Sequence, residues 1–198
     1  MSSIFGNNIL GNNATLVGSS SSTAPSIFPP LYDFPPFFTR YPNASTWTAQ
    51  RAAWSSLILA YCKAHKLWQL HLSDALETEL FHNAALGRRL KHQDAVEVLE
   101  FMAKEGQVDW IDESNKTGVN VWWKKPEEWG SVIFDWIDST GQKGSVLTLY
   151  EIAHGDLTTA QEFHGMEEGM LKKALGVLVK RGSAQIFGSG EEMGVKFF

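Results

Sequence analysis

The sequence has a single cysteine, no long apolar run and no charge near its start, and each absence excludes a class of protein. Cys62 has no second cysteine with which to form an intramolecular disulfide. No apolar run approaches the ~18 to 20 residues that a membrane-spanning helix needs. The first charged residue is Asp33, so the N-terminus lacks the basic region of a secretory signal and the arginines of a transit peptide. These absences predict a soluble cytosolic protein.

Large apolar side chains are scarce in residues 1–26, which are rich in Ser, Asn and Gly. Such a segment cannot offset the entropy lost on ordering, so we expect it to be disordered. Six of the seven prolines fall within the first 42 residues, and proline interrupts regular helices and strands. The sequence therefore predicts a proline-rich arm over residues 27–42, with regular structure beginning near Asn43.

The region after the arm contains an internal repeat. A helix expected at 92–104 has one apolar face, and the same pattern returns 76 positions later in a helix expected at 167–180. The paired residues are Ala95 and Leu171, Val98 and Ala174, Leu99 and Leu175, and Met102 and Leu178. The same offset relates Gly106 to Gly182 and Gly118 to Gly194, so the repeat extends beyond the helix.

Each repeat is expected to contain a helix, a short strand, two further helices and a β-hairpin. In the first repeat we expect helices at 45–66, 79–90 and 92–104, a strand at 67–72, and a hairpin between Val108 and Trp123. This order is typical of a winged-helix domain. The predicted fold is α+β, with two tandem winged-helix domains at 43–124 and 125–198. The alternative is one mixed α+β domain whose halves resemble each other by accident.

The charge balance disfavours nucleic-acid binding, which is the most common role of winged helices. Phosphate contacts need a basic surface, but the chain carries a net charge of −5. Residues 43–124 contain nine basic and ten acidic side chains, and residues 125–198 contain seven and eleven. The helix expected at 167–180 is mixed, with Glu167 and Glu168 against Lys172, Lys173, Lys180 and Arg181. A local basic patch there would make a nucleic-acid-binding protein the alternative function.

No catalytic or metal-binding constellation is evident. The six histidines are scattered without metal-ligand spacing. Cys62 and His65 are three residues apart on one expected helix, but a cysteine beside Ile58 and Tyr61 is more typical of a core position than of a nucleophile. The glycine-rich stretch 188–194 precedes a strand and is interpreted as a hairpin tip rather than a phosphate loop. The sequence predicts a non-enzymatic protein without cofactor or metal.

The arm carries two Pro-Pro-x-aromatic units, six residues apart. Pro-Pro pairs favour the polyproline II helix, whose three-residue turn would point both units in one direction. Large aromatic side chains are typical of binding hot spots. We therefore predict a partner-docking site formed by Pro29, Pro30, Tyr32, Phe34, Pro35, Pro36, Phe37 and Phe38. The alternatives are that the arm packs on its own first domain, or that Pro-Pro-x-Tyr is a ligand for a WW domain.

Six stretches of the sequence resemble one known family. They are "FPPFFT", "WSSLILAYC", "KPEEWG", "TLYEIAHG", "EFHGMEEGMLKKAL" and "GVKFF". In this order they are similar to the small winged-helix subunit of ESCRT-II, the twenty-fifth of the vacuolar protein sorting proteins, and the similarity extends from Pro29 to Phe198. The resemblance implies two tandem winged helices and two copies of the subunit per complex, each attached to one of the two larger ESCRT-II subunits.

In that family the Pro-Pro-x-aromatic motifs dock in hydrophobic pockets of the larger subunits. Carried over to this sequence, Pro29, Pro30 and Tyr32 would form one anchor, and Pro35, Pro36 and Phe38 the other. Phe38 lacks the tyrosine hydroxyl of the Pro-Pro-x-Tyr pattern, which weakens the case for an essential hydrogen bond at the second anchor.

The resemblance also implies a role for residues 125–198, because the C-terminal winged helix of the family recruits the first, myristoylated subunit of ESCRT-III. The complex sorts ubiquitinated cargo into multivesicular bodies, so the chain would be cytoplasmic and would reach endosomal membranes only through its partners. Four of the five net negative charges fall in residues 125–198, which would attract a basic helix. The simpler interpretation is that Glu127, Glu128, Asp135 and Asp138 keep a helix face solvated.

Overall fold

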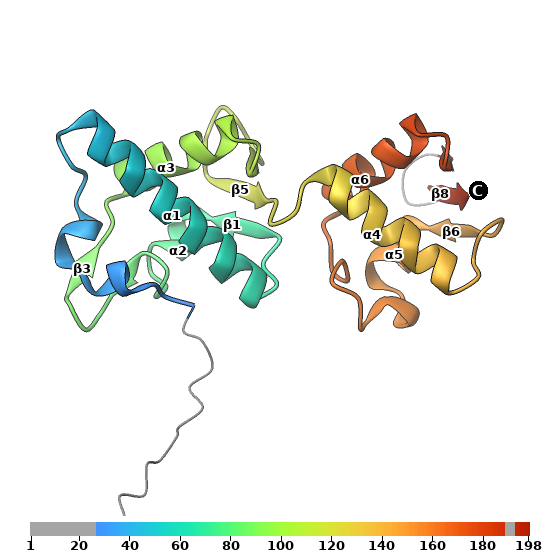
Figure 1. Ribbon diagram of the computed structural model, residues 1–198, viewed down its shortest axis with the longest axis horizontal. Helices are drawn as coiled ribbons and strands as arrows, with labels where there is room; N and C mark the ends of the chain where they lie inside the picture. Colours follow the sequence, from blue (N-terminus) through green and yellow to red (C-terminus); the bar gives the residue numbers. More distant parts are fainter. Residues whose placement is uncertain (1–26, 189–192) are drawn as a thin grey trace, which may run out of the picture.

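Helix α1 (Ala44–Ala64) begins where the sequence supplies a cap. The side-chain oxygen of Asn43 accepts hydrogen bonds from the backbone N–H groups of Ser45 and Thr46, at 3.0 and 3.1 Å. These are N–H groups that the helix itself leaves unpaired. The computed structural model, which describes residues 27–188 and 193–198, contains two units built from such locally encoded elements, one after the other along its long axis (Figure 1).

The first unit packs α1 and α3 (His92–Lys104) against a three-stranded antiparallel sheet. Its central strand is β5 (Gly118–Val121), which pairs with β1 (Gln69–His71) on one side and β4 (Val108–Trp110) on the other. The short elements between β1 and α3 are α2 (Leu72–Ala75) and a two-stranded hairpin of β2 (His82–Asn83) and β3 (Arg88–Arg89).

The second unit repeats this plan with α4 (Pro126–Ser139) as its first helix. Its sheet has β8 (Gly194–Phe197) between β6 (Val146–Thr148) and β7 (Ala184–Phe187). Helix α5 (Leu149–His154) and helix α6 (Glu168–Lys180) lie between β6 and β7 in the chain. Thr148 and Glu151 form a capping box at the start of α5, since each accepts a hydrogen bond from the other's backbone N–H.

The predicted repeat is confirmed in three dimensions. Helices α3 and α6 have the same length and are offset by 76 residues, as are β5 and β8. The first helices differ: α1 has 21 residues and α4 has 14. Buried residues of these two helices correspond at an offset of 75, so that Trp54 matches Trp129 and Ile58 matches Ile133. The prediction of an α+β protein with two tandem winged helices is therefore correct.

The helix expected at 79–90 is wrong. Leu80, Phe81 and Leu90 are fully buried, but the chain between them forms the β2–β3 hairpin. Asn83 stabilises this turn by accepting a hydrogen bond from the N–H of Leu86 at 3.0 Å. Gly87 follows with a φ of +57°, a left-handed conformation that other residues adopt at a cost. Burial of the same apolar residues thus supports a hairpin as well as a helix.

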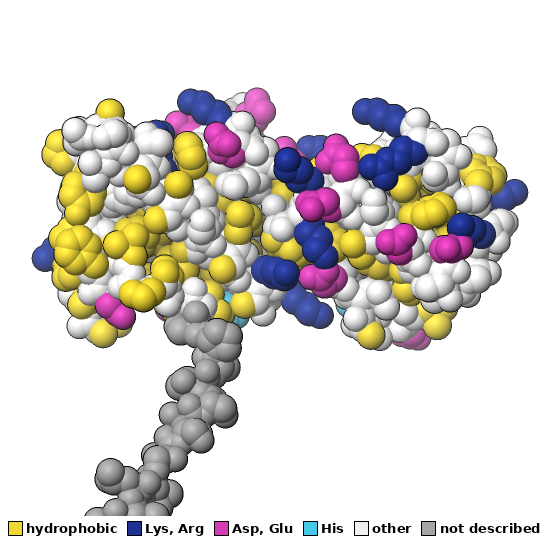
Figure 2. All heavy atoms as spheres, in the orientation of Figure 1, with side chains coloured by type: hydrophobic (Ala, Val, Ile, Leu, Met, Phe, Trp, Pro, Cys, Tyr) yellow, Lys and Arg dark blue, Asp and Glu magenta, His cyan; other side chains and the backbone are white. Residues whose placement is uncertain are grey.

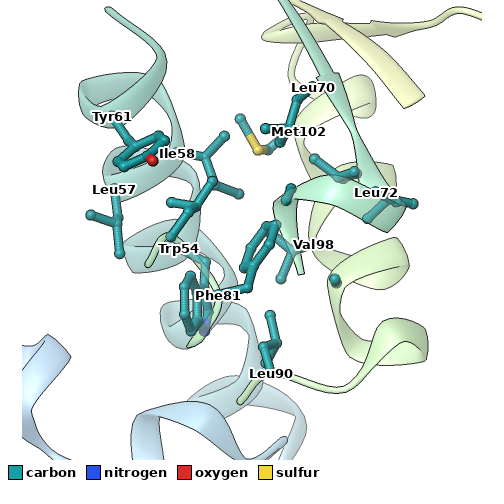
Figure 3. Close-up of a cluster of buried hydrophobic side chains, with 14 of the residues drawn as sticks. Trp54, Leu57, Ile58, Tyr61, Leu70, Leu72, Phe81, Leu90, Val98 and Met102 are labelled. Atoms are coloured by element: carbon teal, nitrogen blue, oxygen red, sulfur yellow. The ribbon is translucent and has the colours of Figure 1, made fainter. Parts of the chain in front are cut away.

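Each unit has its own apolar core. In the first core, Trp54, Ile58 and Tyr61 of α1 face Val98 and Met102 of α3, and the other labelled residues fill the space between helices and sheet (Figure 3). The second core is built from α4, α5, α6 and the sheet, and it also includes Trp68 and Trp122, which lie outside the second unit in sequence. In the view of Figure 2, charged side chains gather at the junction between the two units, whereas much of the first unit's visible surface is uncharged.

Candidate functional site

The arm is a folded element rather than a polyproline II helix. It forms two short 3-10 helices, η1 (Pro30–Asp33) and η2 (Pro35–Phe38), separated by the extended residue Phe34. Their turns are closed by hydrogen bonds from the N–H of Tyr32 to the carbonyl of Pro29 at 2.8 Å and from the N–H of Phe37 to the carbonyl of Phe34 at 2.9 Å. Proline suits the first position of each turn because it needs no hydrogen-bond acceptor there.

Aromatic packing holds the arm against the first unit. Phe37 stacks on Trp54 of α1 with ring centroids 4.3 Å apart and an interplanar angle of 8°. Phe38 meets the edge of the same indole at 5.5 Å, and Tyr32 meets Phe38 at 5.2 Å. The exposed fractions of Tyr32, Phe37 and Phe38 are 7%, 1% and 2%, so all three side chains belong to the first core. The structure therefore favours the alternative that the arm packs on its own first domain, and regular structure begins before Asn43.

Polar side chains of the first unit bind the backbone of the arm. Gln50 donates to the carbonyls of Phe37 and Thr39 at 2.6 and 3.0 Å, and the indole N–H of Trp54 donates to the carbonyl of Phe37 at 3.2 Å. Asn83 donates to the carbonyl of Tyr32 at 3.1 Å. These bonds satisfy carbonyl groups that a 3-10 turn leaves unpaired.

The Tyr32 hydroxyl donates to the backbone carbonyl of Glu79. Burial is the main reason why the pKa of Tyr32 rises to about 12, and the nearby carboxylates of Glu79 and Asp33 add to the effect. The phenol is therefore held as a neutral hydrogen-bond donor, and the first Pro-Pro-x-Tyr unit uses its tyrosine inside this chain.

The predicted docking residues consequently divide into two groups. Tyr32, Phe37 and Phe38 face inward, and Pro29 and Pro36 are half-buried. The outward group, which we call the arm edge, consists of Pro30, Leu31, Phe34 and Pro35. Leu31 and Phe34 are 41% and 48% exposed, which is high for large apolar side chains. Sequence reasoning missed Leu31, because it occupies the variable position of the motif and only the direction of the turn exposes it.

A shallow apolar pocket lies between the arm edge and α1. Leu31, Phe34, Tyr41 and Ala49 are among its lining residues, and carbon atoms dominate the exposed lining. Ala49 exposes its methyl group on the first turns of α1, where a larger side chain would fill the pocket. The structure thus combines protruding apolar side chains with an apolar recess, an arrangement typical of a protein–protein contact surface.

The second unit has a groove of its own between α5 and α6, whose lining is about equally polar and apolar. Leu149, Tyr150, Ala153 and Leu171 line it together with Met166, His154 and Glu168. Tyr150 is 69% exposed, and Leu157, which follows α5, is 74% exposed. We call these two side chains and the groove the second-unit surface. Sequence reasoning placed a partner on this unit but did not identify these residues.

Two of the four carboxylates suggested on the second unit are engaged within it. Glu128 accepts a hydrogen bond from the backbone N–H of Lys125 at 2.7 Å and so caps α4. Asp138 pairs with Lys143 at 2.7 Å. Glu127 and Asp135 are exposed on α4. For these two, both interpretations remain predictions: a contact for a basic partner, or a solvated helix face.

The helices that would enter a DNA groove have much of their charge already paired. On α6, Lys172 pairs with Glu168, and Lys173 pairs with Asp109 at 2.8 Å. On α3, Glu97 accepts a hydrogen bond from the Trp47 indole at 2.9 Å. The charged side chains of α3 are mostly acidic, and two of the three lysines of α6 are ion-paired, so neither helix offers the free basic face that phosphate binding requires.

The Cys62 thiol does not have the properties of a nucleophile. Its side chain is fully buried, and burial raises the pKa of the thiol to about 12. His65 is exposed and packs on the Tyr61 ring at 4.3 Å. Within residues 27–188 and 193–198, no three His, Cys, Asp or Glu side chains cluster in a way that would hold a metal ion. The tip of the glycine-rich stretch, at 189–192, lies outside the described residues.

Comparison with known proteins decides between the remaining interpretations. A family model described as "ESCRT-II complex subunit" matches residues 31–167. Vacuolar protein-sorting-associated protein 25 of Xenopus laevis is 43% identical over 171 residues, which cover 86% of this chain and 98% of that protein. The human protein of the same name is 42% identical, with 86% and 97% coverage. The chain belongs to the ESCRT-II subunit family of vacuolar protein-sorting-associated protein 25.

Solved structures of the ESCRT-II subunit family support the fold. A crystal structure of subunit VPS25 of ESCRT-II matches with a TM-score of 0.75 and 32% identity, covering 85% of this chain and 97% of that one. A chain in a structure of the ESCRT-II complex described as VPS22/VPS25/VPS36 matches with a TM-score of 0.77 and 33% identity, covering 87% of this chain and all of that one. The tandem winged helix is therefore the family fold.

Membership of the ESCRT-II subunit family fixes the broad role of the chain. It is a non-enzymatic subunit that functions in endosomal sorting. No helix in the described part of the chain is long and apolar enough to cross a bilayer.

Proposed function

We propose that this ESCRT-II subunit attaches to the two larger subunits, VPS22 and VPS36, through its arm edge. One copy would bind each larger subunit, giving two copies per complex. Residues 125–198 would then recruit the first subunit of ESCRT-III, so that ubiquitinated cargo enters multivesicular bodies. The chain would reach the endosomal membrane only through these partners.

The observation that carries the first part is the outward direction of Leu31 and Phe34. A fixed 3-10 framework holds these side chains in solvent beside an apolar pocket, while Tyr32 and Phe37 anchor the framework inside the first core. A preformed contact surface loses less entropy on binding than an unfolded arm would. The arm edge supplies the apolar area, and the buried aromatic residues supply the rigidity.

The arm edge can be tested without disturbing the core. Deleting residues 26–41 would remove three core side chains and would confuse loss of docking with loss of folding. The double variant Leu31→Ser, Phe34→Ser changes only exposed side chains, and Ile111→Ser is a matched control because Ile111 is 42% exposed on the first unit, away from the arm. We expect the double variant to lose co-purification with the larger subunits and the control to retain it, with unchanged circular dichroism in both.

Retained co-purification of the double variant would refute docking through the arm edge. In that case the larger subunits would have to contact another surface of the chain. Loss of co-purification in the Ile111→Ser control as well would show that any exposed apolar substitution weakens the complex, and it would also count against the proposal.

The second part of the proposal rests on the second-unit surface. Tyr150 and Leu157 are the two most exposed large apolar side chains of the described residues, and Tyr150 lines the groove between α5 and α6. A groove of mixed polar and apolar lining, with exposed apolar side chains on the same unit, suits an amphipathic helix.

Recruitment can be measured on the assembled ESCRT-II complex. We expect the double variant Tyr150→Ser, Leu157→Ser to assemble normally but to lose binding of the first ESCRT-III subunit to vesicles that carry ESCRT-II. Phe198→Ser is the control, since Phe198 is 53% exposed at the other end of the second unit. Normal recruitment by the double variant would move the ESCRT-III contact elsewhere on residues 125–198.

A further inference from the structure

The connection between the two units has four residues, 122–125, and contacts hold every one of them. The Trp122 side chain is 5% exposed, its indole N–H donates to the Asp109 carboxylate at 2.5 Å, and its backbone N–H donates to the carbonyl of Gln107 at 2.8 Å. Lys124 pairs with Glu162 of the second unit. The backbone N–H of Lys125 is bound by the α4 cap. Flexible linkers have the opposite character, being rich in Gly and Ser and free of contacts.

Three tryptophans from three different segments meet at this connection. Trp68 comes from the loop before β1 in the first unit, Trp123 from the connection itself, and Trp129 from α4 in the second unit. The ring centroid of Trp68 is 4.0 Å from that of Trp123 and 5.4 Å from that of Trp129, and Trp123 and Trp129 are 6.0 Å apart. Trp68 is 7% exposed and Trp129 is fully buried. A side chain of the first unit therefore completes the core of the second.

Two sets of ion pairs also join the units. Glu162, in the loop before α6, lies 3.6 Å from the Lys63 ammonium at the end of α1, and it also binds Lys124. These lysines lower the pKa of Glu162, with Lys124 giving the larger effect. Lys173 of α6 reaches back to Asp109 of β4 at 2.8 Å.

The aromatic and ionic contacts contribute differently. Exposed ion pairs contribute little to stability individually, because solvent screens them. The ion pairs nevertheless restrict the relative orientation of the units, since Glu162 and Asp109 connect different elements of the two units. The tryptophans supply buried apolar area, which resists separation irrespective of salt. Domains joined by a small polar interface are expected to move relative to each other. This interface instead has a buried aromatic centre, and contacts hold every residue of the connection.

We propose that this junction, consisting of Trp68, residues 122–125, Trp129 and the two ion-paired carboxylates, fixes the orientation of the two winged helices in the free chain. The protein is then a rigid strut rather than two domains on a hinge. The arm edge and the second-unit surface are held at a constant separation and angle. Whatever binds one unit positions the other without any further conformational change.

Residual dipolar couplings of backbone N–H groups in the full 198-residue chain test this directly. If the junction is rigid, one alignment tensor will fit the couplings of both units in the orientation that the structure shows. Trp123→Ala removes one of the three rings, and we expect the units to require separate tensors in this variant while each unit alone still fits its wild-type structure. Glu77→Gln is the control, because Glu77 pairs with Arg89 on the first unit, away from the junction.

Several outcomes would overturn the proposal. Wild-type protein that needs two tensors, or a single tensor with a different orientation of the units, would show that the junction does not hold them as described. A Trp123→Ala chain that keeps the wild-type tensor would show that the aromatic contact is not what fixes the units. Glu162→Gln distinguishes the ionic contribution: we expect it to retain a shared tensor at low salt, because the tryptophans remain. The readout needs no partner, so it is independent of the proposed function.

Discussion

Replacing Phe37 with alanine should destabilise the first winged helix, although Phe37 lies in a proline-rich segment before the first α-helix. The ring is 1% exposed and stacks on Trp54. An aromatic side chain buries ~150–250 Å², and at ~25 cal/mol per Å² its removal costs about 3–5 kcal/mol once the retained alanine carbon is allowed for. That is a fifth or more of the ~5–15 kcal/mol by which a domain is usually stable.

The measurement is urea unfolding followed by circular dichroism, with Phe34→Ala as the matched control. Phe34 is the same residue type three positions away, but it is 48% exposed. We expect Phe37→Ala to lower the urea midpoint of the first unit strongly, and Phe34→Ala to change the free energy of unfolding by less than about 1 kcal/mol. Equal effects of the two substitutions would refute the inclusion of the arm in the core.

Two further predictions concern titration and close backbone approach. The first unit should lose stability as pH rises from about 10 towards 12, because unfolding releases the proton that the folded state keeps on Tyr32, whose pKa is raised to about 12. Urea titrations at alkaline pH should show that Tyr32→Phe removes part of this loss. An unchanged pH dependence in the variant would contradict the prediction. Gly118→Ala should cost about 1–3 kcal/mol, since its Cβ would lie 3.1 Å from the backbone oxygen of Leu70. Gly194→Ala should lower the free energy of unfolding by less, because the added Cβ would lie 2.9 Å from the exposed side chain of Val146, which can rotate. The reverse order of thermal midpoints would show that closeness to the backbone does not decide the effect of these two substitutions.

The sequence predicts elements well where the pattern of apolar residues is local. The helix expected at 92–104 is α3, with the same bounds, and the helix expected at 167–180 begins one residue later as α6. Both have a regular apolar face that packs on one side only, so the periodicity contains most of the information. The hairpin strands β4 and β5 are correct for the same reason.

The arm could not be predicted in this way, because its conformation depends on distant residues. Pro-Pro pairs favour polyproline II in isolation. Stacking of Phe37 on Trp54, 17 residues away, and the hydrogen bond from Asn83 to Tyr32, 51 residues away, favour tight turns instead. Both contacts depend on residues distant in sequence, so the conformational preferences of the arm's own residues do not predict them. The motif therefore identified a segment of interest, but which of its side chains face outward is decided by the rest of the fold.

The first helices of the two repeats, α1 and α4, are covered by aromatic side chains in the same way. Trp54 and Trp129 occupy corresponding positions, and each needs an aromatic lid from outside its own winged helix. For Trp54 the lid is Phe37 of the arm, and for Trp129 it is Trp68 and Trp123 at the junction. The repeated module is thus a winged helix together with the aromatic residues before it in the chain, which cover its core tryptophan. A fragment that starts at residue 125 would expose Trp129, so the second winged helix should be studied with the first one attached.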